Sequence, residues 1–584
     1  MLLAAPYQQN YSPINGSLGL SSLIAILPLL VLFVLLSVVR MRAWLAGLIS
    51  VAVAIISAVT VYSMPLGDAL NSGLLGATNG FFPIMWIVIN AIWIYNLTVV
   101  TGLFDVLRRS FASISDDQRV QAIIIAFCFG ALMEALAGFG TPVAICSVML
   151  IALGFKPLKA ATVALVANTA PVAFGALAVP ITTLAGITGL PVGDLGAMVG
   201  RQTPILSVFV PLALIFVVDG KRGLRQVWQP ALLAGVVFGV FQYLASNFWS
   251  VPLADIIAAL ASALALLLFT RVWHAKEGYI ESDADDTPGR GKYRPVIAGG
   301  SENADPDALA RLRADTGQKV HDSGSQVFKA YLPYLIIIVV FVLATRVPAI
   351  TGVAPKVAGK TGTGLEAATH IINWPGLHIV NGAGKAVATT FKLNFLSAAG
   401  TLLLLAGFIT MACLRISPVR GLKAYGKTLD QLKFAILTVM LVLALGFIMN
   451  ESGQTTTLGL WVAGAGGFFA FLSPILGWLG TAVTGSDTSS NSLFGALQVT
   501  AAHKIGLSPT LMAAANSSGG VLGKMISPQN LAIAASAVGL EGREGDLFRR
   551  VIVWSIVFLA FMCALVYLQS TPLLDWMVVA TATS

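Results

Sequence analysis

The chain has 584 residues, of which 57% are hydrophobic and only 10% are charged. Soluble globular domains carry about 25% charged residues, so this chain cannot cover its exterior with polar side chains, and lipid must surround most of it. The net charge of +9 does not indicate nucleic-acid binding, because the basic residues lie mainly in short loops between apolar runs, where they orient a membrane protein.

Apolar runs long enough to cross a bilayer as helices, which takes about 20 residues, occur along the whole chain. In chain order they are 20–39, 43–62, 81–104, 204–218, 228–249, 253–272, 328–348, 393–414, 432–450 and 550–570. Two further regions, 158–183 and 508–538, are long enough but are interrupted by Asn, Gly and Pro. Two more, 120–153 and 457–505, are apolar but broken by glycine-rich polar tips.

The orientation of these runs follows from the basic residues beside them, which the positive-inside rule places in the cytoplasm. These are Arg40, Arg42, Arg108, Arg109, Arg119, Lys221, Arg222, Arg225, Arg271, Lys276, Arg415, Arg420, Lys423, Lys427, Arg543, Arg549 and Arg550. Successive spans place all these basic residues in the cytoplasm only if 120–153 and 457–505 are re-entrant hairpins. The first hairpin then opens to the cytoplasm and the second to the outside. The sequence thus predicts an all-α polytopic membrane protein with about 12 spans, two re-entrant hairpins and both termini periplasmic.

Residues 274–327 are rich in Asp, Glu, Lys, Arg and Gly and contain few apolar residues. This composition predicts a flexible cytoplasmic linker between two halves. The chain then divides into a first transmembrane repeat (1–220), linking helices (221–273), the linker and a second transmembrane repeat (328–584). The external stretch 350–391 is too weakly patterned for an assignment.

The two interrupted regions carry the same residues at the same spacing. An Asn is followed by a Gly seven residues later and by a Pro five residues after that, at Asn168, Gly175 and Pro180 and again at Asn516, Gly523 and Pro528. The hairpin tips GFGTP (138–142) and GSDTS (485–489) also correspond, as do GFKP (154–157) and GLSP (506–509). Because charge orients the two halves oppositely, the pattern predicts an inverted repeat whose paired interrupted helices mark a binding site. Chance similarity is the alternative.

Interrupted helices and hairpin tips supply what a carboxylate needs inside a bilayer. Its charge must be met by donors already in place, and a new helix N-terminus exposes unpaired N–H groups. We expect helix breaks at Asn168–Thr169 and at Asn516–Gly520. The alternative is that the small and polar residues only let helices pack closely. The candidate substrate-binding residues are Gly138, Gly140, Thr141, Asn168, Thr169, Ser486, Thr488, Ser489, Asn516, Ser517, Ser518, Gly519 and Lys524.

Three charged residues fall at predicted membrane depth, where ionisable groups are rare and usually functional. Lys524 is a candidate to hold the substrate carboxylate as a fixed positive charge. Glu134 and Asp487 are candidates to carry a coupled proton, because desolvation favours the neutral form of a carboxyl group. The alternative for each is a structural ion pair, for example Lys524 with Asp487.

The stretches EALAGFGTPVAI (134–145), LVANTAPVAFGALAVPI (165–181), TGSDTSSNSLFGALQ (484–498) and NSSGGVLGKMISPQN (516–530) resemble those of the bacterial L-lactate permease family, which also includes glycolate permeases. The likeness covers nearly the whole chain. It implies uptake of lactate or glycolate with a proton across the inner membrane, paired re-entrant hairpins and elevator-type movement.

The leading hypothesis is a proton symporter for small 2-hydroxy monocarboxylates. A sodium-coupled dicarboxylate carrier is the nearest alternative, and a sensor that binds lactate without moving it is another. An intramembrane enzyme would need a metal cluster or a catalytic dyad, and a primary pump a nucleotide-binding glycine loop. We find none of these patterns, so we expect no cofactor, no metal and no enzymatic activity. The sequence does not separate lactate from glycolate, since one methyl group distinguishes them, and it leaves homo-oligomerisation open.

Overall fold

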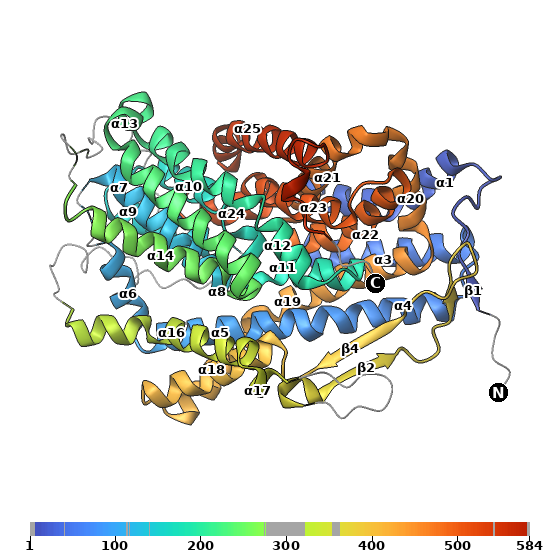
Figure 1. Cartoon of the computed structure of the whole chain (residues 1–584), viewed down its shortest axis with the longest axis horizontal. Helices are drawn as coiled ribbons and strands as arrows, with labels where there is room; N and C mark the ends of the chain where they lie inside the picture. Colours follow the sequence, from blue (N-terminus) through green and yellow to red (C-terminus); the bar gives the residue numbers. More distant parts are fainter. Residues whose placement is uncertain are drawn as a thin grey trace.

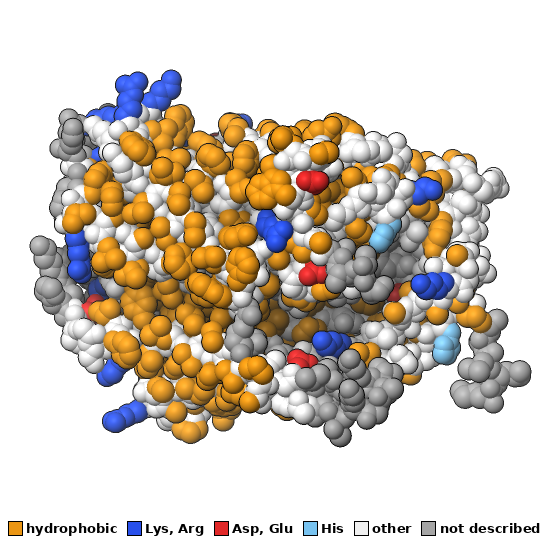
Figure 2. All heavy atoms as spheres, in the orientation of Figure 1, with side chains coloured by type: hydrophobic (Ala, Val, Ile, Leu, Met, Phe, Trp, Pro, Cys, Tyr) orange, Lys and Arg blue, Asp and Glu red, His pale blue; other side chains and the backbone are white. Residues whose placement is uncertain are grey.

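The computed structural model describes residues 6–39, 41–112, 115, 117–138, 140–273, 275, 279, 322–352, 363–540 and 543–580. Helices form most of it and lie packed along one another (Figure 1). In this part of the chain, ten helices are long and apolar enough to cross a membrane, or up to eleven if one bent pair counts as a span. Figure 2 shows a face covered largely by hydrophobic side chains, with several Lys and Arg at its left edge. The prediction of an all-α polytopic membrane protein is confirmed, whereas this count does not confirm the predicted 12 spans.

The helices before residue 270 are α1 (Leu18–Ala25), α2 (Leu27–Ser37), α3 (Ala43–Thr60), α4 (Leu66–Asn79), α5 (Trp86–Val100), α6 (Leu103–Ala112), α7 (Gln118–Ala122), α8 (Gly130–Ala137), α9 (Thr141–Ala152), α10 (Pro157–Ala167), α11 (Gly175–Thr188), α12 (Val192–Val199), α13 (Thr203–Leu244) and α14 (Ala254–Phe269). Those after residue 322 are α16 (Gly324–Arg346), α17 (Pro348–Thr351), α18 (Ala399–Cys413), α19 (Pro418–Glu451), α20 (Gln454–Val462), α21 (Phe469–Thr484), α22 (Asp487–Ile505), α23 (Pro509–Gly523), α24 (Pro528–Ala537) and α25 (Glu544–Gln569).

One helix begins well before its predicted apolar run, and a separate helix precedes another run. The run expected from residue 81 follows α4, which begins at Leu66 and lies end to end with α5 (Figure 1), and the backbone between them departs from helical geometry at Phe82. The helix expected at 432–450 starts at Pro418, after Ser417 caps it by accepting a hydrogen bond from the Arg420 N–H. Hydropathy detects only the apolar part of a helix, so helical turns with polar side chains escape it.

The long helix α13 consists of two arms that correspond to the predicted runs 204–218 and 228–249. The chain departs from helical geometry at Gly220 and Val227. A Cβ atom at Gly235 in the second arm would lie 2.7 Å from the carbonyl oxygen of Val208 in the first. Glycine therefore permits the two arms to pack closely against each other.

Two small sheets occupy part of the region that the sequence left unassigned. β2 (Thr369–Asn373) pairs antiparallel with β4 (Thr390–Asn394), and β1 (Tyr7–Gln8) pairs parallel with β3 (Ile379–Val380). Figure 1 shows β2 and β4 beside α4, away from the packed helices around α23. The β1–β3 pair thus joins the first described residues to the segment that precedes α18.

Most of the predicted linker at 274–327 lies outside the described residues. On one side of it, the Tyr279 ring lies 5.6 Å from the guanidinium carbon of Arg119. On the other, Asp322 accepts two hydrogen bonds of 2.8 Å from Arg109, and these bonds hold the pKa of the Asp322 carboxyl below its usual range. Both flanks are therefore anchored close to the connection between α6 and α7.

The predicted helix break at Asn516–Gly520 is wrong. Helix α23 continues through this stretch to Gly523, and the chain leaves the helix at Lys524–Ser527. Its small residues serve close packing instead: a Cβ atom at Gly519 would collide with the Pro474 backbone of α21. For this segment the packing alternative is correct, because backbone contact between α21 and α23 requires glycine.

This contact predicts a strong effect of one methyl group at Gly477. A Cβ atom there would collide with the backbone carbonyl of Asn516 on α23. Gly477→Ala should therefore destabilise the protein by about 1–3 kcal/mol, seen as a lower melting temperature in detergent. The matched control is Gly426→Ala in α19, where a Cβ atom would meet nothing within 4 Å, so its stability should be unchanged or slightly higher. Equal melting temperatures for the two variants would contradict the packing account.

Candidate functional site

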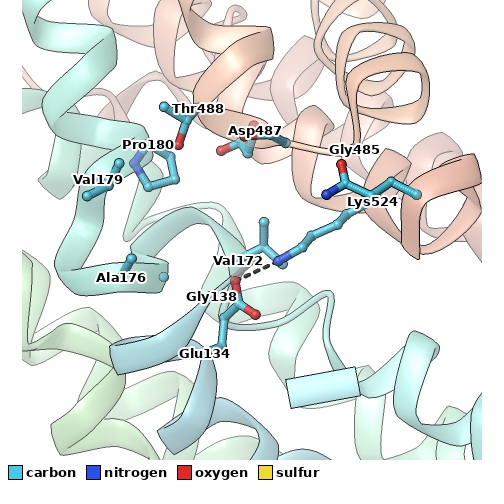
Figure 3. Close-up of a pocket in the computed structure, with 13 residues that line it drawn as sticks. Glu134, Gly138, Val172, Ala176, Val179, Pro180, Gly485, Asp487, Thr488 and Lys524 are labelled. Carbon is cyan, nitrogen blue, oxygen red and sulfur yellow. Dashed lines mark hydrogen bonds and ion pairs between the residues drawn. The ribbon is translucent and has the colours of Figure 1, made fainter. Parts of the chain in front are cut away.

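A cavity of about 50 Å³ lies where two segments far apart in the sequence meet. Figure 3 shows its lining side chains converging from the two segments. The first segment contributes Glu134, Gly138, Val172, Gly175, Ala176, Val179 and Pro180, and the second contributes Gly485, Ser486, Asp487, Thr488, Lys524 and Gln529. A space of this size holds a few water molecules or part of a small organic molecule.

Glycines form the turn between α8 and α9 beside the cavity. Gly138 and Gly140 have φ values of 32° and 84°, which favour glycine. At Gly140 a Cβ atom would also lie 2.5 Å from Ile533 of α24. The turn therefore docks against a helix of the other segment, and Glu134 reaches the cavity from the last turn of α8.

The turn between α21 and α22 has a matching construction. Gly485 has a φ of 77°, and Ser486 caps α22 by accepting a hydrogen bond from the Ser489 N–H. Asp487 and Thr488 then form the first turn of α22 and line the cavity. The positive end of α22 is thus directed toward the same space as Glu134.

The first interrupted helix contains a left-handed turn beside the cavity. After α10 ends at Ala167, the residues Ala176, Leu177 and Ala178 have φ values of 45°, 55° and 61°. Such a conformation costs about 1–2 kcal/mol per residue for non-glycine residues, and strained backbone of this kind is often found at binding sites. The predicted break at Asn168–Thr169 is confirmed by the end of α10 at Ala167, with Asn168 as its C-cap.

The equal Asn–Gly–Pro spacing has a structural counterpart at its prolines. Right-handed helix resumes near Pro180 after the left-handed turn, and Pro528 is the first residue of α24. Proline suits the first turn of a helix, where no backbone hydrogen-bond donor is needed. In both interrupted regions the proline of the motif therefore lies near the point where right-handed helix resumes.

A buried ion pair joins the two segments across the cavity. Lys524 Nζ donates to Glu134 Oε1 at 2.6 Å, and the side chains are only 7% and 4% exposed. Asn168 Nδ2 donates to the other carboxylate oxygen, Oε2, at 2.9 Å. A Cβ atom at Gly175 would lie 2.8 Å from Oε1, so glycine makes room for the carboxylate. The alternative pair of Lys524 with Asp487 is not formed.

Asp487 is held by hydroxyl and amide donors. Its Oδ2 atom accepts from Ser517 Oγ at 2.6 Å and from Asn491 Nδ2 at 3.4 Å. Asn516 donates in turn to Asn491 Oδ1 at 2.9 Å, and Asn491 Nδ2 also donates to the Pro180 carbonyl at 3.1 Å. Asn516 and Ser517 therefore orient the residues of the cavity without lining it.

The structure sorts the predicted site residues into three groups. Those that line the cavity are Glu134, Gly138, Ser486, Asp487, Thr488 and Lys524. Those that hold a cavity residue or its partner are Asn168, Ser489, Asn516 and Ser517. The others make different contacts: Gly140, Thr141, Thr169, Ser518 and Gly519.

Sequence reasoning missed Asp255, a fully buried acid of α14. Gln242 Nε2 donates to its Oδ1 atom at 2.8 Å and also to the Ala170 carbonyl in the helix break at 3.4 Å. A signal existed, since Asp255 lies inside the predicted span 253–272, but an acid so near the start of a run is easily taken for a boundary residue.

The cavity therefore combines a fixed positive charge, two buried acids and the start of two helices. Lys524 can bind a carboxylate, and Glu134 already occupies that position as its counter-ion. Ser486, Thr488 and Gln529 add groups that can hydrogen-bond a hydroxyl. Such a site fits a small organic anion whose carboxylate competes with Glu134 for Lys524.

Comparison with known proteins gives a consistent result. The model of the family described as L-lactate permease matches residues 21–573. An L-lactate permease of Bacillus subtilis is 41% identical over 98% of this chain and 100% of its own. A glycolate permease of Escherichia coli is 41% identical over 97% and 98%, and an L-lactate permease of Escherichia coli is 40% identical over 98% and 99%. Among solved structures, the YdaH transporter of Alcanivorax borkumensis aligns over 84% of this chain and 86% of its own, at 14% identity and a TM-score of 0.42.

Proposed function

Since the chain belongs to the L-lactate permease family, we propose that it takes up L-lactate, glycolate and related 2-hydroxy monocarboxylates by proton symport across the bacterial inner membrane. Membership makes it a multi-pass membrane transport protein and not an enzyme. The observation that supports the substrate class most directly is the buried pair of Lys524 with Glu134 in a cavity between two distant segments.

The substrate carboxylate binds at Lys524 in place of Glu134. A lysine buried this deeply requires a negative partner at every stage, because an uncompensated charge inside a protein costs several kcal/mol. The substrate and Glu134 both offer a carboxylate, and Lys524 lines the cavity that the substrate would enter. The two carboxylates therefore alternate as counter-ions of one lysine.

This exchange couples the substrate to a proton. When the substrate takes Lys524, Glu134 remains buried beside Asn168 without its cation, so it must bind a proton to stay there. Asp487 is the other candidate proton carrier, but Ser517 and Asn491 hold it where it is. One proton with one monoanion moves no net charge, so a pH difference of one unit supplies about 1.4 kcal/mol, roughly tenfold accumulation.

The transport architecture we propose has 12 spans with two re-entrant hairpins in an inverted repeat. The hairpins are formed by α8 with α9 and by α21 with α22, and the interrupted helices by α10 with α11 and by α23 with α24. Support comes from the matched glycine turns and from the two prolines of the motif, Pro528 at the start of α24 and Pro180 just after the left-handed turn of α11. Residues 1–220 and 328–584 then form the repeats, with both termini periplasmic and elevator-type movement of the hairpin region.

Uptake of labelled L-lactate into proteoliposomes tests the function. When the outside is more acidic than the inside, the pH gradient should drive accumulation of lactate without sodium. In counterflow, unlabelled glycolate should compete with lactate, and a dicarboxylate should not. Accumulation that requires sodium, or competition by a dicarboxylate alone, would support the sodium-coupled alternative instead. Binding of lactate without any counterflow would indicate a sensor.

A further inference from the structure

The cavity has two chemically different walls. Figure 3 shows Ala176, Val179 and Pro180 on the left, opposite Lys524 on the right. The apolar wall comes entirely from the first interrupted region, whereas the polar residues Asp487 and Thr488 come from the start of α22. A molecule bound between these walls would contact polar groups on one side and apolar groups on the other.

The residues of the apolar wall are short and firmly placed. Val172, Ala176 and Val179 line the cavity and are at most 5% exposed, so the rest of each side chain is packed against protein. Ala176 belongs to the left-handed turn, where its φ is 45°. Close packing on the far side of this wall prevents it from receding to admit a larger group.

A 2-hydroxy acid has three groups to place around its second carbon. Its carboxylate requires the charge of Lys524, and its hydroxyl requires a hydrogen-bonding partner such as Thr488 or Asp487. The remaining substituent, a hydrogen in glycolate and a methyl group in lactate, then faces the opposite wall. Figure 3 shows Ala176, Val179 and Pro180 on that side, and Val172, which also lines the cavity, toward the middle of the view.

We propose that Val172, Ala176 and Val179 form the surface that contacts the substituent on the second carbon, and thereby set the preference among glycolate, lactate and larger 2-hydroxy acids. This inference rests on the proposed function, because it assumes that the carboxylate lies at Lys524. A single methylene in an apolar pocket discriminates substrates by about 10- to 200-fold. Two valines and one alanine are therefore sufficient to separate these acids.

The test changes the depth of this wall one methyl group at a time. Val179→Ile should shift the competition ratio of lactate to glycolate toward glycolate by about tenfold, and Val179→Ala should improve competition by 2-hydroxybutyrate by a similar factor. Val172→Ala repeats the enlargement at a second position and keeps the test decisive if isoleucine is not tolerated. The readout is a ratio of half-inhibitory concentrations against labelled glycolate, which a general loss of folded protein does not change.

The matched control is Val163→Ala in α10, because Val163 is buried but does not line the cavity. Its ratios should equal those of the unchanged protein. Ratios within about twofold of the unchanged protein for both Val179 variants and for Val172→Ala would overturn the inference. If the unchanged protein moves no monocarboxylate at all, the proposed function itself fails, which is a different result from unchanged ratios.

Discussion

Replacing Lys524 with Ala is expected to abolish uptake of lactate and glycolate while the protein remains in the membrane. Among the residues that the structure describes, Lys524 is the one cation that lines the cavity, and these residues offer a small monoanion no other positive charge there. The expected loss is complete at substrate concentrations that saturate the unchanged protein. Uptake of labelled lactate into cells, normalised to protein in the membrane fraction, measures it.

The variant needs two controls because it leaves Glu134 without its cation. Removing one partner of a buried pair costs about 3–5 kcal/mol, so Lys524→Ala combined with Glu134→Gln tests whether any loss of activity reflects instability. The double variant should be as stable as the unchanged protein and still inactive. Lys504→Ala, an exposed lysine at the end of α22, should transport normally. Normal uptake by Lys524→Ala would remove this lysine from the site.

Glu134→Gln is expected to separate transport from the proton. Glutamine resembles the protonated acid, so Lys524 should be free to bind substrate at any pH. Counterflow of labelled lactate should persist and lose its dependence on pH, whereas accumulation driven by a pH gradient should disappear. The result follows from Lys524 Nζ donating to Glu134 Oε1 at 2.6 Å, which makes Glu134 the competitor of the substrate.

The control is Glu366→Gln, a glutamate that accepts a hydrogen bond from Thr369 outside the cavity. It should keep both counterflow and accumulation. If Glu134→Gln still accumulates lactate in response to external acid, the proton is carried elsewhere. Asp487→Asn is then the next variant to examine, since Asp487 lines the same cavity.

The repeated Asn–Gly–Pro spacing predicted the places of its two prolines. Pro528 is the first residue of α24, and Pro180 lies in α11 just after the left-handed turn at Ala176–Ala178. The spacing misled at Asn516, where the helix continues to Gly523. Whether a glycine-rich stretch breaks a helix or packs against another depends on the facing backbone, here that of Pro474, which sequence spacing does not reveal.

The sequence alone could not identify the ion-pair partner of each charged residue. The sequence singled out Glu134, Asp487 and Lys524 as intramembrane charges, and all three line one cavity. It suggested Lys524 with Asp487 as an ion pair, but the structure pairs Lys524 with Glu134. The two residues are 390 positions apart, and only the folded structure, which brings Lys524 to Glu134 of α8, decides between two nearby acids.

Calorimetric binding of L-lactate to the purified protein tests the exchange at Lys524 most directly. The binding enthalpy is measured in several buffers of different ionisation enthalpy at one pH, and its dependence on the buffer gives the protons bound. If lactate displaces Glu134, the unchanged protein should take up about one proton per lactate and Glu134→Gln should take up none. Tight lactate binding with no proton uptake by the unchanged protein, or with equal uptake by both proteins, would contradict the account.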